Sequence, residues 1–257
     1  MQLTPPYHEL KMSKKNKISI ITASFQSQKT IKDTLDSVNI QSYPNIEHII
    51  IDGASSDGTL DLVKNHGKRV KTVLSEPDKG IFDAYNKGLA LCEGEVIGIL
   101  NSDDFYYEPH VIRDVMRQFE DASVDAVYAD LLYVDKDDTD KVVRYWKSRA
   151  YCDGDFKKSF SPAHPTLFLR RSVYSKSGGF KSDYRYSGDY EFMLRVFHIH
   201  KINSVYLPQI FVKMRTGGAT GGSIKFIKKQ NLEILRALEN HDVRIYKALF
   251  FSRKFFD

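Results

Sequence analysis

The sequence has few of the features that mark secreted, metal-clustered or membrane-spanning chains. It contains two cysteines in 257 residues, Cys92 and Cys152, without the Cys/His spacing of a metal site or an even framework of bridges. No apolar run approaches the roughly 18 residues that a spanning helix needs. Residues 1–16 form a polar leader with a proline pair and no apolar segment of signal-peptide length. These absences predict a globular protein of a reducing compartment that is not integral to a membrane.

Composition is ordinary for a folded chain, with 42% hydrophobic and 28% charged residues and a formal net charge of +5. Much of the surplus of positive charge falls in residues 223–257, where cations alternate with large apolar side chains. This pattern predicts an amphipathic helical tail. The tail can lie on an anionic bilayer or pack on the domain with its basic face in solvent, and the sequence leaves both open. Nucleic acid is not expected, because the basic residues are scattered and carry no recognised motif.

Apolar strands alternate with amphipathic helices in the first half of the chain. We expect strands at 18–24, 46–52, 70–75, 95–101 and 126–134, and helices at 30–41, 80–91 and 109–119, with another capped by Asp57 and running to Asn65. Strands joined by crossover helices predict an α/β fold with a doubly wound, mainly parallel sheet and helices on both faces.

The pattern loosens after residue 135. We expect an edge strand at 141–148, an irregular stretch at 154–165, a strand at 166–169, and helices at 171–177 and 188–200. One or two late strands lie around Pro208, in 202–214. The glycine-rich stretch 216–222 predicts a mobile loop.

One apolar run ends on two adjacent carboxylates, Asp103 and Asp104, within Asn101-Ser102-Asp103-Asp104. Two acids at the end of a buried strand are costly unless a cation lies beside them. Mg²⁺ and Mn²⁺ prefer carboxylate and diphosphate oxygens, and ligands of open α/β sheets bind beyond the carboxyl ends of strands. A solvated Asp-Asp turn is the alternative. Polar residues at the ends of three further strands fall at the same edge.

This ordered set of strand ends resembles the family 2 glycosyltransferases, which have the nucleotide-sugar-binding GT-A fold and build bacterial O-antigen, capsule or exopolysaccharide. The resemblance covers roughly residues 17–222. It divides them into a nucleotide-sugar-binding half, 17–134, and an acceptor half, 135–222.

The resemblance implies a set of nucleotide-sugar contacts at the strand ends: Thr22, Ala23, Ser24, Phe25, Asp52, Asp78, Lys79, Ser102 and Asp103. The ring of Phe25 is expected to stack on a pyrimidine. Members often have a second aspartate where this chain has Gly53, so Asp52 is expected to read the base, with a turn-forming role as the alternative. Asp103 is implied to face the ribose and Asp104 a divalent metal, Mn²⁺ or Mg²⁺.

The acceptor side is indicated by Ser187-Gly188-Asp189-Tyr190-Glu191, which resembles the family's acidic motif with Gly188 in place of the usual glutamate. The resemblance implies that Asp189 is the general base, and a helix N-cap role can coexist with it. His164, Lys213 and Arg215 are weaker candidates for contacts to the acceptor or the diphosphate. Their alternatives are a hydrogen-bonded structural histidine and ordinary surface charge.

The reaction implied is inverting, metal-dependent transfer of one hexosyl or N-acetylhexosaminyl unit from a nucleotide sugar, expected to be a UDP-sugar. A saccharide or polyprenyl-diphosphate-linked acceptor would receive it, in the cytoplasm or at the inner face of the cytoplasmic membrane. Single transfer is favoured because the Gln-x-x-Arg-Trp motif of processive synthases is absent. The alternatives are a sugar nucleotidyltransferase, although Ser24-Phe25-Gln26-Ser27 has no glycine, and a non-catalytic nucleotide-sugar-binding protein.

Overall fold

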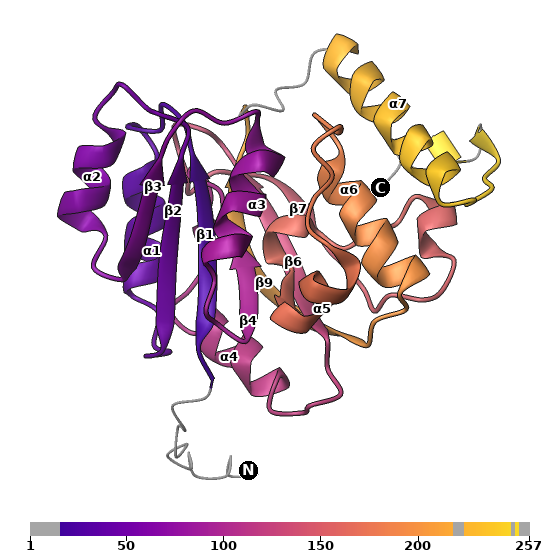
Figure 1. The fold of residues 1–257 in the computed structure, drawn as a ribbon, viewed down its shortest axis with the longest axis horizontal. Helices are drawn as coiled ribbons and strands as arrows, with labels where there is room; N and C mark the ends of the chain where they lie inside the picture. Colours follow the sequence, from indigo (N-terminus) through magenta and orange to yellow (C-terminus); the bar gives the residue numbers. More distant parts are fainter. Residues whose placement is uncertain (1–15, 218–223, 248–249, 252–257) are drawn as a thin grey trace.

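The computed structural model describes residues 16–217, 224–247 and 250–251. Within these ranges, nine strands form one sheet with helices on both faces (Figure 1). Residues 1–15 of the expected leader and 218–222 of the expected glycine-rich loop lie outside the described residues.

The first four strands of the sheet are parallel and lie in the order β3-β2-β1-β4. They are β1 (Ile18–Ser24), β2 (Ile46–Asp52), β3 (Val70–Ser75) and β4 (Val96–Ile99). The register pairs Ser24 with Asp52 and Asp52 with Ser75. The carboxyl ends of β1, β2 and β3 are therefore level, which places the predicted donor residues along one edge.

The second half of the sheet is mixed. The short strand β8 (Phe168–Arg170) lies antiparallel between β4 and β6 (Ala126–Val134), and β9 (Ser204–Arg215) runs parallel to β6. Two further strands pair antiparallel, β5 (Phe105–Tyr106) with β9 and β7 (Val142–Trp146) with β6. The expected parallel arrangement thus ends at β4, where β8 is inserted.

The late strand β9 is continuous across Pro208, where one or two strands were expected. Its register against β6 shifts on both sides of Asp130. A proline lacks the N–H that a regular ladder uses, so it is tolerated at such an irregularity.

Helices cover the two faces of the sheet with separate hydrophobic cores. Ile20 points into one core and Ile21 into the other, because successive strand residues face opposite sides. One face carries α1 (Ile31–Asn39), α2 (Thr59–His66) and α4 (Val111–Gln118). The other carries α3 (Ile81–Leu91), α5 (Arg171–Ser177) and α6 (Gly188–Met193).

The expected helix 188–200 is divided. It consists of α6 followed by a π-helical segment, Leu194–Ile199. In the stretch expected to be irregular, two short 3₁₀ helices occur, η1 (Asp155–Lys158) and η2 (His164–Thr166).

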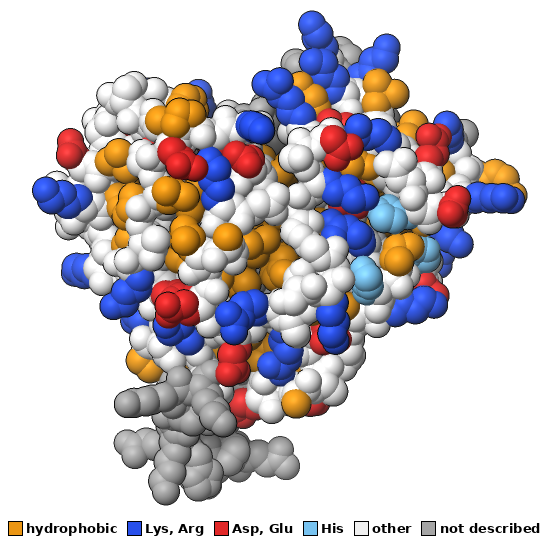
Figure 2. Space-filling view, in the orientation of Figure 1, with side chains coloured by type: hydrophobic (Ala, Val, Ile, Leu, Met, Phe, Trp, Pro, Cys, Tyr) orange, Lys and Arg blue, Asp and Glu red, His pale blue; other side chains and the backbone are white. Residues whose placement is uncertain are grey.

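The helix α7 (Ile224–Asn240) packs against α6 (Figure 1). Its buried side chains Ile234, Ala237 and Leu238 belong to the same core as α3 and α6. One face of this expected tail therefore packs on the domain. Figure 2 shows lysine and arginine side chains gathered about the outer side of α7. No helix among the described residues has the length and apolar character needed to cross a bilayer.

Candidate active site

The loops that follow β1, β2 and β4 are tied together at the carboxyl edge of the sheet. Gln26 has a left-handed backbone, with φ of 51°, and its side-chain oxygen accepts the N–H groups of Ser56 and Asp57. The hydroxyls of Ser27 and Ser102 lie 2.7 Å apart. These contacts join the loops after the strands into one preformed rim.

Asp52 is fully buried at the end of β2. Its carboxylate accepts from the hydroxyl of Ser24 at 3.1 Å, from the N–H and hydroxyl of Ser55 at 2.8 and 2.6 Å, and from the hydroxyl of Ser75 at 2.8 Å. These bonds tie the ends of β1, β2 and β3 together. The contacts match the turn-forming alternative, and a role in reading the base stays a prediction.

Phe25, Gly53 and Asp78 lie together at this edge, and we call these three residues the donor cluster. The Phe25 ring is 63% exposed. A Cβ at Gly53 would lie 2.8 Å from Asp78 Oδ2 and 3.2 Å from Phe25 Cδ2, so the close approach of these two side chains requires glycine. The other oxygen of Asp78 accepts from the N–H of Gly80 at 2.8 Å, which holds the carboxylate in place.

The other expected donor contacts differ in their accessibility. Thr22 is fully buried and its hydroxyl lies 2.9 Å from His48 Nε2, so this side chain is not presented at the edge. Ala23 packs on the core, and the hydroxyl of Ser24 donates its hydrogen bond to Asp52. Lys79 is exposed, and its backbone N–H donates to Asp83.

The acidic pair consists of a half-buried Asp103 and an Asp104 that is 1% exposed. The Asp104 carboxylate accepts from Asn101 Nδ2 and from the backbone N–H of Arg215, each at 3.3 Å. Burial raises the pKa of Asp103. Burial, and then the charge of Asp103, raise the pKa of Asp104 well above its ordinary value. Adjacent carboxyls whose ionised forms are disfavoured in this way are suited to a divalent cation.

The described residues contain no group of three or more His, Cys, Asp or Glu side chains that could hold a metal ion. Among the described residues, no third His, Cys, Asp or Glu therefore joins the acidic pair in a metal-binding group. A magnesium or manganese ion there would take its remaining ligands from a diphosphate and water, which such ions accept readily.

Arg215 and Lys213 are both engaged by protein groups. The buried guanidinium of Arg215 donates to the carbonyl oxygen of Asp103 at 2.7 Å, pairs with Asp33, and lies 4.9 Å from the centre of the Phe105 ring. Lys213 Nζ donates to the carbonyl of Thr139 at 3.1 Å. Arg215 therefore holds the acidic pair in place through hydrogen bonds. The expected contacts of Arg215 and Lys213 with the diphosphate stay a prediction.

Tyr85 connects α3 to the acidic pair, a relationship that sequence reasoning missed. Its hydroxyl donates to Asn101 Oδ1 at 2.5 Å, and Asn101 in turn donates to Asp104. Burial, and then the charges of Asp189, Asp104 and Asp103, raise the pKa of Tyr85. Asp189 therefore lies within electrostatic reach of the same phenol as the acidic pair. Helical spacing from Phe82 marks Tyr85 as buried, but nothing local indicates its partner.

Asp189 is half-buried in the first turn of α6, and its Oδ1 accepts the N–H of Tyr190 at 2.8 Å. Ser187, not Asp189, is the N-cap residue, so the capping interpretation of Asp189 is wrong. A Cβ at Gly188 would lie 2.7 Å from the Phe82 ring. This contact explains why glycine stands where a glutamate was expected.

His164 is buried beside Tyr85 and Phe180, with ring centres 6.0 and 5.7 Å away. Burial lowers the pKa of His164, while the charge of Asp189 opposes that shift. The imidazole is therefore neutral at neutral pH. It lies near the acceptor side, and its contact with an acceptor stays a prediction.

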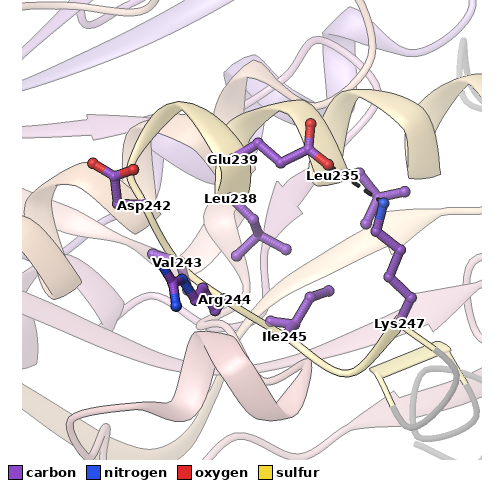
Figure 3. Close-up of a pocket in the computed structure, with 8 residues that line it drawn as sticks. All are labelled: Leu235, Leu238, Glu239, Asp242, Val243, Arg244, Ile245 and Lys247. Atoms are coloured by element: carbon purple, nitrogen blue, oxygen red, sulfur yellow. Dashed lines mark hydrogen bonds and ion pairs between the residues drawn. The ribbon is translucent and has the colours of Figure 1, made fainter.

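A cavity of about 430 Å³ lies elsewhere, between the end of α7 and the segment that follows it (Figure 3). Glu239 and Lys247 form an ion pair beside it. It is lined by Leu235, Leu238, Glu239, Asp242, Val243, Arg244, Ile245 and Lys247. None of the predicted site residues lines this cavity, so it is not the candidate active site.

Comparison with known proteins identifies the family. The sequence model of glycosyl transferase family 2 matches residues 19–178. The chain belongs to glycosyl transferase family 2. It is 25% identical over 226 residues to a PGL/p-HBAD biosynthesis glycosyltransferase of Mycobacterium tuberculosis, covering 82% of each chain. It is 30% identical over 183 residues to an uncharacterized glycosyltransferase of the same organism, covering 69% of this chain and 68% of that one.

The solved structures show the fold. TarS of Staphylococcus aureus, in complex with UDP-GlcNAc, matches with a TM-score of 0.67 and 18% identity over 93% of this chain and 72% of that chain. The chain spans 40% of a longer TarS structure. The mannosyltransferase PcManGT of Pyrobaculum calidifontis, in complex with GDP-Man and Mn²⁺, matches with a TM-score of 0.65 and 16% identity over 90% of this chain and 65% of that chain.

The fold is therefore GT-A, as expected, and the protein is a glycosyltransferase. This assignment removes the two alternatives, a sugar nucleotidyltransferase and a non-catalytic binding protein.

Proposed function

We propose that this glycosyltransferase moves one sugar from a UDP-sugar to a hydroxyl of a saccharide or polyprenyl-diphosphate-linked acceptor, with inversion and with a divalent metal. The observation that carries the proposal is the acidic pair, whose carboxyls have pKa values raised by burial and which lies at the same sheet edge as the donor cluster. The UDP-GlcNAc complex of TarS and the GDP-Man and Mn²⁺ complex of PcManGT support it.

The donor cluster is the proposed contact of the uracil. The exposed Phe25 ring offers a face for stacking, which is worth about 1–3 kcal/mol for a nucleobase on an aromatic side chain. The absence of a side chain at Gly53 lets the Asp78 carboxylate lie close to that ring, where it is offered as a hydrogen-bond acceptor. Lys79 follows at the exposed rim, where the ribose or diphosphate would pass.

The metal is assigned to the acidic pair. The expectation from the sequence gave it to Asp104, but Asp104 is 1% exposed and already accepts two N–H groups, whereas Asp103 is half-buried. We therefore assign the first contact to Asp103, with Asp104 behind it. When bound there, Mn²⁺ or Mg²⁺ supplies positive charge that offsets the charge of the departing diphosphate.

Asp189 is the proposed general base. Its Oδ1 is occupied by the N–H of Tyr190, so Oδ2 is assigned to the proton of the acceptor hydroxyl. The hydroxyl oxygen forms a bond to the anomeric carbon while the bond from that carbon to the diphosphate oxygen breaks. The proton goes to Asp189 and UDP leaves with the electron pair. An α-linked donor yields a β-glycoside because attack occurs from the opposite face.

The outer face of α7 is the proposed contact with anionic lipid at the inner face of the cytoplasmic membrane. Lys225, Lys228 and Lys229 are exposed there, together with Ile227 and Leu232. Cations beside apolar side chains favour an anionic surface. Co-sedimentation with anionic but not zwitterionic vesicles is expected, and a triple Lys→Gln variant at these positions should abolish it. Equal recovery with both vesicle types would reject the contact.

The activity is tested with a panel of UDP-sugars, Mn²⁺ and lipid-linked acceptors, scored for free UDP and for glycosylated product. Asp189→Asn should bind donor normally and keep only a measurable residual rate of transfer, while Asp103→Asn should lose metal-stimulated donor binding. Asp137→Asn, at an exposed carboxylate, is the matched control and should behave as wild type. Absence of product across the panel, or normal turnover by Asp189→Asn, would reject the proposed reaction.

A further inference from the structure

The carboxylate of Glu233, on α7, binds the backbone of the segment that leads into Gly188 and Asp189. Oε1 accepts the N–H of Arg185 at 2.9 Å, and Oε2 accepts the N–H groups of Tyr186 and Ser187, both at 2.8 Å. Hydrogen bonds to an ionised acceptor are shorter and stronger than neutral ones. One side chain thus fixes three consecutive peptide groups, the last of which belongs to the N-cap residue of α6.

Other groups of α7, one backbone carbonyl and one side chain, hold the same segment. The Ser187 hydroxyl donates to the carbonyl of Gln230 at 3.1 Å. Arg236 donates to the carbonyl of Asp183 at 2.8 Å and lies 3.9 Å from the centre of the Tyr184 ring. The segment from Asp183 to Ser187 is therefore bound by α7 along its whole length.

The position of the first turn of α6 is also restricted from its other side, by α3. Gly188 lies against the Phe82 ring, so closely that a Cβ would be 2.7 Å from it. Phe82 belongs to α3, which also carries Tyr85 and hence the contact to the acidic pair. The turn that holds Asp189 is thus placed between α3 and α7.

We propose that Glu233 is a positioning residue, which sets the place of the Asp189 carboxylate relative to the acceptor hydroxyl. This inference rests on the proposed role of Asp189 as the base. A carboxylate is required because both of its oxygens accept. A glutamine has one accepting oxygen, and its NH₂ group would face at least one of the three N–H donors.

The test compares Glu233→Gln with Glu239→Gln, a matched control on the same helix whose exposed carboxylate pairs with Lys247. Because a small displacement of a reacting group can cost about 100-fold in rate, we expect Glu233→Gln to lower kcat by about 10- to 100-fold. The Kd for UDP, measured by calorimetry, should not change. Glu239→Gln should match wild type in both. Glu233→Asp keeps the charge but is one methylene shorter, and should recover part of kcat.

A double variant separates positioning from general loosening. If Glu233 acts through Asp189, then Glu233→Gln should cause no further loss of rate in an Asp189→Asn background. Wild-type kcat for Glu233→Gln, a further loss in that background, or a matching loss of UDP affinity would overturn the inference. If Glu233→Gln does not fold, as judged by thermal unfolding, Glu233→Asp carries the same comparisons.

The experiments distinguish failure of the proposed base, Asp189, from failure of the proposed positioning residue, Glu233. Normal turnover by Asp189→Asn removes the base, whereas an inactive Asp189→Asn with a fully active Glu233→Gln rejects the positioning role alone.

Discussion

The guanidinium of Arg215 donates a hydrogen bond to the backbone carbonyl of Asp103 at 2.7 Å. The backbone N–H of Arg215 also donates to the carboxylate of Asp104. The end of β9 therefore holds the acidic pair, although the two segments are separated by more than a hundred residues. The planar guanidinium makes a second contact with Asp33, which fixes its direction.

Arg215→Lys should weaken metal-stimulated UDP binding. A lysine carries the charge on one flexible ammonium and cannot hold the Asp103 carbonyl and Asp33 in the same fork geometry. We expect a loss of about 10-fold in affinity, together with a lower thermal midpoint. Calorimetry with UDP and Mn²⁺ measures the first, and Arg113→Lys, on α4, is the control. An unchanged affinity for UDP would show that the contacts of Arg215 with Asp103 and Asp33 do not support the metal site.

Phe25→Ala should weaken UDP binding without affecting stability. The ring is 63% exposed, so truncating it removes little buried packing from the core. The truncation does remove the proposed stacking surface. We expect about a 10-fold higher Kd for UDP, or more. Tyr246→Ala removes another exposed ring, 87% exposed, and should have no effect. Gly53→Ala should act like Phe25→Ala, because the added methyl would displace the Asp78 carboxylate and the Phe25 ring. Normal UDP binding by both variants would place the base elsewhere.

The parallel half of the sheet could be predicted from sequence because its signals are local. Runs of β-branched residues end at clear turns, and the strands at 18–24, 46–52 and 70–75 have the expected bounds, as does the strand at 126–134 in the mixed half. The insertion of β8 and the pairing of β5 with β9 depend on contacts between distant segments. Strands of two or three residues carry too little periodicity to indicate such partners.

The same distinction applies to the site. Placement of Phe25, Asp78 and the acidic pair at one edge follows from the parallel strands. The accessibility of each side chain does not follow from the strand arrangement, because it depends on contacts between distant segments. Serines from three segments enclose Asp52, and Asp33 and Asp103 enclose Arg215. The contact of Glu233 with the Asp189 turn likewise depends on how α7 docks.

Asp52→Asn should destabilise the fold. The carboxylate accepts hydrogen bonds on both oxygens, whereas an amide has one acceptor and places N–H groups against the serine donors. We expect a loss of about 1–3 kcal/mol in the free energy of unfolding, measured by urea titration. The alternative role in base reading gives a different result, with normal stability and a higher Kd for UDP.

Metal binding should release protons and weaken as the pH falls. Burial and the charge of Asp103 raise the pKa of Asp104, so this carboxyl holds its proton at a higher pH than an ordinary aspartic acid. A cation must displace that proton, which couples affinity to pH. Calorimetry of Mn²⁺ binding in two buffers of different ionisation enthalpy measures the release. Asp104→Asn should release fewer protons. A Mn²⁺ affinity independent of pH in wild type would contradict the assignment.

Acid sensitivity of the fold should depend on Glu191. Burial acts to raise the pKa of Glu191, but hydrogen bonds from Arg195, Lys181 and His241 outweigh it and lower the pKa below 4.5. The unfolded chain therefore binds more protons in that range. The contribution of Glu191 to stability is complete above pH 4.5 and is lost as the pH falls through the lower, folded-state pKa.

Glu191→Gln should remove this acid-dependent part and cost about 3–5 kcal/mol at neutral pH, because Arg195 would remain buried without its counter-charge. Urea titrations at a series of pH values measure both effects. Glu239→Gln, at an exposed ion pair, should change stability by less than about 1 kcal/mol. An unaltered pH dependence in Glu191→Gln would mean that other carboxylates govern acid unfolding.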